Sequence, residues 1–313
     1  MKDLKVVFMG TPDFSVPVLQ GLIDTCNVIG VVTQPDKEVG RKKEIEFSPI
    51  KKLAIANNIK VLQPEKIRTD FQCVLDLNPD IIITCAYGQI IPVEILEYPK
   101  YKCINVHASL LPKYRGGAPI HRAIINGEKE TGITIMYMAP GMDDGDIISQ
   151  EKISIGENET VGELHDKLSV MGKELLLKTL PSIIDGTNER IKQDETKVSL
   201  AKIIKKEDEV IDFNDSAINV HNKIRGLSPF PGGYALLEDK RVKFYKSKVE
   251  KTNIAALPGT IVKVDKTGMY VKTNDELVVI EELKIEGKKR LTIQDLLNGM
   301  NKEELLNKIF RKE

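Results

Sequence analysis

The chain lacks the marks of a membrane, secreted or metal-binding protein. No apolar run approaches the ~18 residues of a membrane-spanning helix, and the amino terminus has no signal-peptide pattern. The four cysteines show no CxxC spacing, and no Cys/His cluster has metal-site spacing. Three of them, Cys26, Cys85 and Cys103, lie in or beside apolar runs. We therefore expect a cytoplasmic protein with buried free thiols and no bound metal.

Net charge is also absent. Lys and Arg number 46, as do Asp and Glu. A nucleic-acid partner would therefore have to meet a local basic patch rather than the field of the whole protein. At 313 residues the chain can form two domains, each with its own core. No sequence feature demands a partner subunit, so we expect a monomer.

The phosphate-binding fingerprint of dinucleotide-binding proteins is missing. The turn Gly10-Thr11-Pro12-Asp13-Phe14 stands where a GxGxxG loop would be. Pro12 removes a backbone donor, and Asp13 adds a negative charge where a phosphate would bind. These features argue against a nicotinamide dinucleotide and against a phosphorylated substrate at this turn.

The first half of the chain alternates between strand and helix patterns. Strands are expected over residues 4–9, 28–32, 59–62, 81–86, 101–106 and 133–138, and helices over 16–23, 49–56, 118–126 and 161–179. The run 81–86 is nearly all apolar, which is typical of a strand buried on both faces of a parallel sheet. The pattern predicts a doubly wound, mostly parallel, Rossmann-like α/β sheet with its ligand site at the carboxyl ends of the strands.

The second half changes character after Pro181. Polar and charged residues over 188–206 indicate a linker between a catalytic domain (1–187) and a second domain (207–313). Within 211–227 the pattern favours an initial helix. Five short strands follow, over 234–237, 242–245, 260–264, 268–272 and 277–283, and a closing helix is expected over 292–308. This spacing predicts a small antiparallel, OB-like β-barrel.

Asn105-Val106-His107 is the most informative segment. It ends an apolar, strand-like run, and residues i and i+2 of a strand share a face, so Asn105 and His107 can point into one site. A single histidine there would usually bind backbone, but two polar residues on one face favour a functional site. An amide donor beside an imidazole can hold a carbonyl oxygen as it becomes an oxyanion. This predicts transfer of a small acyl group.

A carboxylate from a second segment would complete a proton-transfer set. The turn Gly141-Met142-Asp143-Asp144-Gly145-Asp146 follows a strand and can return to the same edge of the sheet. On composition alone, Asp143 and Asp144 serve equally well. The segments Ser109-Leu110-Leu111-Pro112 and Tyr87-Gly88-Gln89-Ile90-Ile91-Pro92 are candidate walls of an apolar cofactor slot.

Two basic regions favour a polyanionic partner. Gly40-Arg41-Lys42-Lys43 forms the tip of a long loop after a strand, at the expected ligand edge of the sheet. The second domain adds Lys240, Arg241, Lys243, Lys246, Lys248, Lys251 and Lys288-Lys289-Arg290. An RNA that spans both domains would fit this distribution, whereas the alternative is a solvated barrel that merely packs on the first domain. His121, His165 and His221 lie in helical stretches and are expected to be structural or exposed.

Together these segments resemble the folate-dependent formyltransferases. The similarity is carried by residues 9–14, by Thr33-Gln34-Pro35-Asp36 with Gly40-Arg41, by residues 105–116 and by residues 131–146. The Asn-x-His and Ser-Leu-Leu-Pro motif is specific to formyl transfer, while the turn at residues 10–14, the basic insertion and the barrel resemble the branch that acts on initiator tRNA. Tyr114 stands where Trp is common in the family, and Ala108 where Gly is common.

The resemblance implies roles for individual residues. It makes Asn105, His107 and Asp143 the catalytic trio, with Asp143 preferred to Asp144. It implies folate binding by Ser109, Leu110, Leu111 and Pro112, and the pattern of the other candidate wall adds Gln89. It also implies that Arg41 contacts the acceptor end of the tRNA, and the basic cluster adds Lys42 and Lys43 as tRNA-binding residues.

The implied reaction transfers the formyl group of 10-formyltetrahydrofolate to the methionine of initiator methionyl-tRNA at the start of translation. Three alternatives remain open at this point. One is another formyl acceptor, either glycinamide ribonucleotide or an amino sugar nucleotide. The others are a hydrolase that passes the formyl group to water, and an RNA-binding module with a degenerate catalytic domain.

Overall fold

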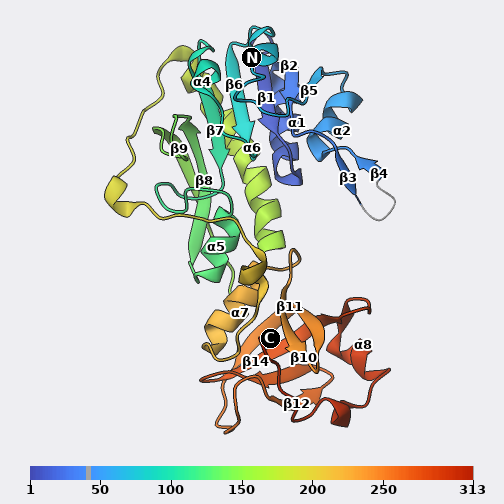
Figure 1. Ribbon diagram of the computed structural model, residues 1–313. Coiled ribbons are helices and arrows are strands. Elements are labelled where there is room, and N and C mark those ends of the chain that lie inside the picture. Colours follow the sequence, from blue (N-terminus) through green and yellow to red (C-terminus); the bar gives the residue numbers. More distant parts are fainter. Residues whose placement is uncertain (40–43, 313) are drawn as a thin grey trace. The chain divides into compact units, whose positions relative to one another are not determined.

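The computed structural model describes residues 1–39 and 44–312, which form two compact units (Figure 1). The first unit contains Met1–Pro119, Thr131–Ile153 and His165–Ala201. The second contains Ile120–Glu130, Ser154–Leu164 and Lys202–Glu313. Because short segments near residues 125 and 159 belong to the second unit, the division is not a single cut in the sequence. The boundaries 1–187, 188–206 and 207–313 stay a prediction.

A seven-stranded sheet organises the first unit, in the order β5-β2-β1-β6-β7-β8-β9. The strands are β1 (Lys5–Gly10), β2 (Asn27–Val32), β5 (Val61–Leu62), β6 (Ile81–Cys85), β7 (Cys103–His107), β8 (Glu130–Tyr137) and β9 (Ile147–Ser154). The pairings from β5 through β7 are parallel, and β7 pairs with β8 in the antiparallel sense. The predicted mostly parallel, Rossmann-like sheet is confirmed, and the antiparallel pairing of β8 is the departure from fully parallel order.

The strand sequences explain this order. All five residues of β6 are buried, as the apolar run 81–86 predicts for a strand covered on both faces. Strand β1 lies beside it, with Phe8 paired to Ile83 and both side chains fully buried. Gly10 ends β1 where an added Cβ would lie 2.8 Å from the carbonyl oxygen of Cys85. A glycine is required there because the backbones of β1 and β6 approach so closely.

Helices connect these strands. They are α1 (Val16–Thr25), α2 (Pro49–Ala56), α3 (Gln72–Leu75), α4 (Val93–Glu97), α5 (Pro119–Ile125) and α6 (Val161–Asp185), with 3₁₀ turns η1 (Asp13–Ser15) and η2 (Glu195–Lys197). Helix α2 begins as expected, with Pro49 in its first turn and the Ser48 hydroxyl accepting from the Lys51 N–H at 3.1 Å. Strand β9 and the β3–β4 hairpin were not expected from the sequence.

The second unit contains a six-stranded sheet in the order β10-β11-β14-β13-β12, with β15 pairing to β14. The strands are β10 (Gly233–Leu237), β11 (Lys240–Glu250), β12 (Ile261–Asp265), β13 (Gly268–Lys272), β14 (Leu277–Ile285) and β15 (Leu291–Thr292), and all their pairings are antiparallel. Helix α7 (Ala217–Gly226) precedes the sheet, and η3 (Lys206–Glu209) lies before it in the chain. The five strands expected from the sequence are all present.

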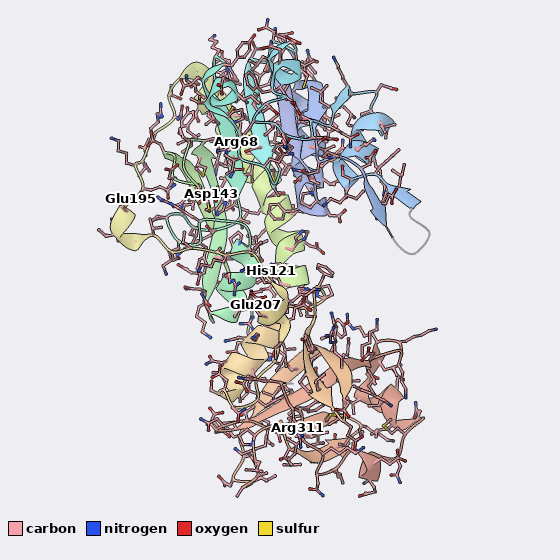
Figure 2. All side chains as sticks on the ribbon, viewed as in Figure 1. Arg68, His121, Asp143, Glu195, Glu207 and Arg311 are labelled. Carbon is pink, nitrogen blue, oxygen red and sulfur yellow. The ribbon has the colours of Figure 1, made fainter. Side chains whose placement is uncertain are left out.

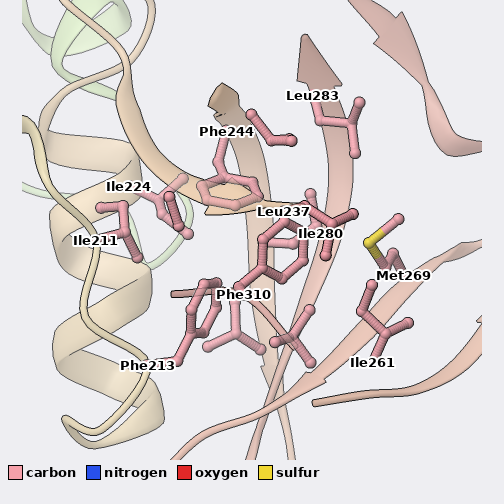
Figure 3. Packing of buried hydrophobic residues seen from close by; sticks show 14 of the residues in the cluster. Ile211, Phe213, Ile224, Leu237, Phe244, Ile261, Met269, Ile280, Leu283 and Phe310 are labelled. Atoms are coloured by element: carbon pink, nitrogen blue, oxygen red, sulfur yellow. The ribbon is translucent and has the colours of Figure 1, made fainter. Parts of the chain in front are cut away.

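An aromatic cluster fills the core of the second unit (Figure 3). The rings of Phe213, Phe244 and Phe310 pack against one another with centroids 5.2–5.7 Å apart. Ile224 of α7 and Ile280 of β14 are buried in the same cluster. Burying an aromatic side chain contributes about 1.5–3 kcal/mol, so these rings are a major part of what holds the sheet to its helix.

The carboxyl-terminal segment joins both edges of this sheet. Arg311 exchanges backbone hydrogen bonds with Leu236 of β10 at 2.8 and 2.9 Å. Asn307 and Phe310 donate to Ile261 and Gly259, at the start of β12. These contacts support the predicted barrel, whose closure stays a prediction. The expected helix over 292–308 is wrong, because helix α8 (Ile293–Leu297) ends early and η4 (Lys302–Glu304) is only a 3₁₀ turn.

Two further expectations can be compared with the structure. Cys26, Cys85 and Cys103 are buried free thiols, as predicted, and burial raises the pKa of Cys85 to about 12. Among residues 1–39 and 44–312, no helix is both long enough and apolar enough to cross a membrane.

Candidate active site

Asn105 and Thr84 face each other near the carboxyl ends of two neighbouring strands. They are register partners in the β6–β7 pair, and Thr84 Oγ1 donates to Asn105 Oδ1 at 2.9 Å. Because this bond occupies the amide oxygen, the Asn105 Nδ2 group faces the site as the donor, and it donates to Asp143 Oδ1 at 3.5 Å. Thr84 was not expected as a site residue. The sequence feature that could have indicated it is its hydroxyl group, which stands within the apolar run 81–86.

His107 ends β7 and is buried, with 6% of its surface exposed. Its Nε2 atom lies 3.0 Å from the carbonyl oxygen of Tyr114. A carbonyl oxygen can only accept, so Nε2 carries the proton of the neutral ring. Nδ1 is therefore the nitrogen that can gain or release a proton, and it lies 3.7 Å from Asp143 Oδ2.

Asp143 completes this group from the turn after β8. Its φ angle is 50°, in the left-handed region that non-glycine residues seldom adopt. In this conformation its carboxylate accepts from the Gly116 N–H at 2.8 Å and lies between Asn105 and His107. Asp144 is exposed to solvent. The geometry therefore places Asp143, and not Asp144, beside the other two side chains.

The loop Tyr114-Arg115-Gly116 contacts both members of the His107–Asp143 pair. Tyr114 provides the acceptor for His107, and Gly116 provides the donor for Asp143. Tyr114 and Gly116 have φ angles of 62° and 117°. A Cβ at Gly116 would also lie 2.9 Å from the carbonyl oxygen of Ala201, so glycine is needed there for two reasons. No site role was expected for this loop, although Gly116 is a visible signal.

The predicted folate segment borders the site through its backbone. Ser109 is fully buried and its hydroxyl donates to Lys113 O at 2.6 Å, while Leu111 packs with Met136 and Ile147. The Leu111 N–H donates to Thr134 Oγ1. Leu110 and Pro112 are half-buried. The side chains of Ser109 and Leu111 are thus engaged within the protein, which leaves Leu110 and Pro112 as the exposed part of the segment.

Gln89 lies in the opposite candidate wall and stabilises the loop around Tyr87. Its side chain accepts from the Ile67 N–H at 2.9 Å and donates to Gln34 Oε1 at 3.2 Å. Gln34 and Thr11 both donate to the Tyr87 carbonyl. Next to Gln89, Ile90 exposes 64% of its surface. This candidate wall therefore combines a backbone held by hydrogen bonds with the exposed apolar side chain of Ile90.

The Tyr87 ring itself is buried, and its hydroxyl has no hydrogen-bond partner among the described residues. Burial raises the pKa of Tyr87 to about 12, so the phenol stays protonated at neutral pH.

The basic tip with Arg41, Lys42 and Lys43 lies outside the described residues. Its flanks pair as the antiparallel strands β3 (Lys37–Val39) and β4 (Glu44–Glu46). Below them, Lys51 Nζ donates to Asp36 Oδ2 at 2.5 Å and to Gln63 Oε1 at 2.8 Å. The hydrogen bond from Lys51 lowers the pKa of Asp36. This network fixes the base of the hairpin.

Several basic residues of the second unit are paired with acidic ones. Lys246 and Lys248 share Glu281, at 3.5 and 3.3 Å, and Lys243 lies 3.7 Å from Glu209. The local positive charge is therefore smaller than the sequence suggests.

The three histidines outside the site lie on helices, as expected. His221 is buried on α7, while His121 on α5 and His165 on α6 are half-buried.

Known proteins are similar to this chain in sequence and in fold. The chain matches the family model described as formyl transferase over residues 4–180, and the formyl transferase C-terminal domain over residues 203–301. It is 51% identical over 298 residues to methionyl-tRNA formyltransferases of Staphylococcus aureus strains MW2 and JH1, covering 94% of this chain and 96% of theirs.

Two solved structures show the same fold at lower identity. WlaRD, a sugar 3N-formyl transferase, has a TM-score of 0.66 and 22% identity, covering 92% of this chain and all of that one. An N-formyltransferase from Helicobacter canadensis has a TM-score of 0.65 and 23% identity, covering 90% of this chain and 99% of that one. The family matches and the 51% identity decide the assignment: the chain belongs to the formyl transferase family.

Proposed function

We propose that this protein transfers the formyl group of 10-formyltetrahydrofolate to the α-amino group of methionine on initiator methionyl-tRNA. The observation that carries the proposal is the convergence of Asn105, His107 and Asp143 from two separate segments onto one point. The 51% identity to methionyl-tRNA formyltransferases over nearly the whole chain supports this choice of acceptor. The protein would act in the cytoplasm at the start of translation, and we propose that it acts as a monomer.

In the first step the methionine amine attacks the formyl carbon, and the carbonyl oxygen becomes an oxyanion. The Asn105 Nδ2 group is held as a donor by the Thr84 hydroxyl, so it can stabilise this charge without reorganising. His107 in its charged form adds a second donor through Nδ1, since Nε2 is already bound to Tyr114 O. The Asn105 donor is fixed before the reaction, and the His107 donor forms when Nδ1 gains a proton. Both lower the barrier because they match the transition state better than the substrate.

Proton transfer accompanies the change of bonds. The attacking nitrogen loses a proton, the bond from the formyl carbon to the folate nitrogen breaks, and that nitrogen gains a proton. Asp143 lies 3.7 Å from His107 Nδ1, close enough to stabilise the charged ring or to pass the proton through one water. The products are formylmethionyl-tRNA and tetrahydrofolate.

The proposed folate site uses the two walls described above. Leu110 and Pro112 on one side and the exposed Ile90 beside Gln89 on the other offer apolar surface to a flat ring, with fixed backbone groups nearby. Such a mixture of apolar side chains and few polar groups suits a planar heterocycle. Ser109 and Leu111 would support the slot from beneath.

The proposed tRNA contacts include Arg41, Lys42 and Lys43. They stand in the sequence between β3 and β4, and Lys51, Asp36 and Gln63 form a network beside that strand pair. Three cations on such a loop would bind phosphates with a strong dependence on salt.

An acceptor assay tests the proposal. Donor carrying a radiolabelled formyl group is mixed with charged initiator tRNA, glycinamide ribonucleotide, an amino sugar nucleotide, or no acceptor. We expect label on the methionine of the tRNA only. Label on another acceptor, or release as free formate at a comparable rate, would overturn the assignment.

A further inference from the structure

The segment after helix α6 returns along the first unit instead of leaving it. Ile191 exchanges backbone hydrogen bonds with Ile147 at 2.8 and 2.9 Å. Arg115 then donates to Ser199 O and accepts from the Ala201 N–H, at 2.9 and 2.7 Å. We call residues 188–201 the return segment. In Figure 2, Glu195 on this segment and Asp143 lie on the same flank of the unit.

Gln193 of the return segment holds the turn that carries Asp143. Its Nε2 group donates to the carbonyl oxygens of Asp143 and Gly145, at 2.7 and 2.8 Å. Its Oε1 atom accepts from Arg115 Nε at 3.0 Å. Two carbonyl acceptors and one guanidinium donor leave only one orientation of the amide. Both hydrogens of the Gln193 amide are therefore used to fix the backbone on either side of Asp144.

The far end of this turn is also held, because Asp146 accepts from Arg190 Nε at 3.0 Å and from the Tyr137 N–H at 2.9 Å, but its middle is open to solvent. Gly141, Met142 and Asp144 are exposed, and Asp143 has the left-handed φ of 50°. A non-glycine residue in that region is strained, and it persists only when its neighbours constrain it. Gln193 supplies that constraint at the Asp143 backbone, while Gly116 supplies it at the carboxylate.

Arg115 connects these two constraints. Its guanidinium is buried, with only 7% of the residue exposed, and it binds Gln193 through Nε and both oxygens of Glu195 through its other nitrogens. Its neighbours Tyr114 and Gly116 contact His107 and Asp143 directly. The Arg115–Gln193 pair therefore sets the position of the Asp143 turn relative to the loop that holds His107.

We propose that Gln193 is a positioning residue for formyl transfer, acting through Asp143. The inference rests on the proposed function of Asp143, and it assigns to the return segment a role in the reaction rather than only a connecting one.

The test compares Gln193→Glu and Gln193→Met with the exposed neighbour Lys192→Ala. The Glu variant keeps an acceptor for Arg115, but it replaces the Nε2 donor with an oxygen that faces the carbonyl oxygens of Asp143 and Gly145. The Met variant removes all three hydrogen bonds of the Gln193 side chain. We expect kcat to fall about 10- to 100-fold in both, because a shift of about 1 Å in a reacting group has that effect. The KM values of both substrates should stay at wild-type values in both Gln193 variants. Lys192→Ala should keep wild-type activity.

A double-mutant cycle with Asp143→Asn separates positioning from a general structural role. If Gln193 acts through Asp143, adding Gln193→Met to Asp143→Asn should lower kcat little further. An equal loss in both backgrounds, or wild-type kcat in both Gln193 variants, would overturn the inference. If the wild-type protein uses a different acceptor, the cycle is measured with that acceptor. In that case the proposed acceptor is wrong, but the cycle still tests whether Gln193 acts through Asp143.

Discussion

Thr84 donates its hydroxyl hydrogen to the side-chain oxygen of Asn105 across 2.9 Å, from the neighbouring strand. This bond determines which end of the amide faces the site. Replacing Thr84 with Val keeps the shape but removes the donor, and the Asn105 amide can then turn over. We expect kcat to fall about 3- to 10-fold, the usual effect of one hydrogen bond.

Thr84→Ser is the matched control, because it keeps the hydroxyl and should retain most of the activity. Steady-state kinetics with saturating donor would show the difference. Equal activities of the Val and Ser variants would mean that the bond to Asn105 has no part in the reaction.

Asn105→Ala should have a larger effect than the Thr84 variant. Removing one oxyanion donor typically raises the barrier by about 2.7–4 kcal/mol, or about 10²–10³ in kcat. Since Asn105 is not among the proposed tRNA contacts, binding of charged tRNA should be unchanged. Single-turnover kinetics together with a filter-binding titration would measure both quantities. Near wild-type turnover in this variant would remove Asn105 from the mechanism.

The β3–β4 loop gives a prediction about salt. Replacing Arg41, Lys42 and Lys43 with Ala should raise the KM for tRNA and reduce its dependence on salt, since each lost phosphate contact lowers the slope by about one. The KM for the folate donor should not change. The matched control removes three exposed lysines elsewhere in the first unit, Lys60, Lys66 and Lys178. If the control triple shifts the salt slope as much, the effect belongs to net charge and not to this loop.

His221 gives a prediction about pH. Burial lowers its pKa, with Arg225 adding to the effect and Glu281 opposing it. The neutral ring donates from Nε2 to Glu157 O at 3.1 Å and accepts at Nδ1 from Ser247 Oγ at 2.9 Å. The unfolded chain therefore binds a proton at a higher pH than the folded chain, so stability falls as the pH drops below about 6.5.

His221→Gln keeps a donor and an acceptor but does not titrate. Its Tm should fall less than that of the wild-type protein between pH 7 and pH 5. Thermal melts at several pH values would compare the two slopes, and parallel slopes would show that His221 does not contribute.

The sequence was sufficient for six of the seven strands of the first sheet because those strands are strongly apolar, and for helices that carry clear start signals. The run 81–86 and the Ser48-Pro49 start of α2 are examples. Strand β9 was not expected, because its middle residues are polar or charged. The prediction of a closing helix over 292–308 was wrong. The apolar periodicity there comes from residues such as Leu305, which pack into the core of the second unit although their backbone is not helical. Tertiary packing overrode a local pattern in that segment.

The candidate site, too, could be predicted only in part from the sequence. The strand period was enough to place Asn105 and His107 on one face. Composition could not separate Asp143 from Asp144, because the left-handed φ of Asp143 and its bond to Gly116 arise only from the folded turn. Gln193 lies 50 residues further along the chain and looks like an ordinary linker residue. No local pattern could indicate that it reaches the Asp143 turn.

The pair Asp143 and Asp144 offers the most direct test of the central claim. Each is replaced by Asn, and the single-turnover rate of formyl transfer to charged initiator tRNA is measured. The account predicts a loss of at least about 100-fold for Asp143→Asn, in the range of general acid–base contributions, and a wild-type rate for the exposed Asp144→Asn. Equal rates for the two variants would contradict the account, because the carboxylate beside His107 would then have no special role.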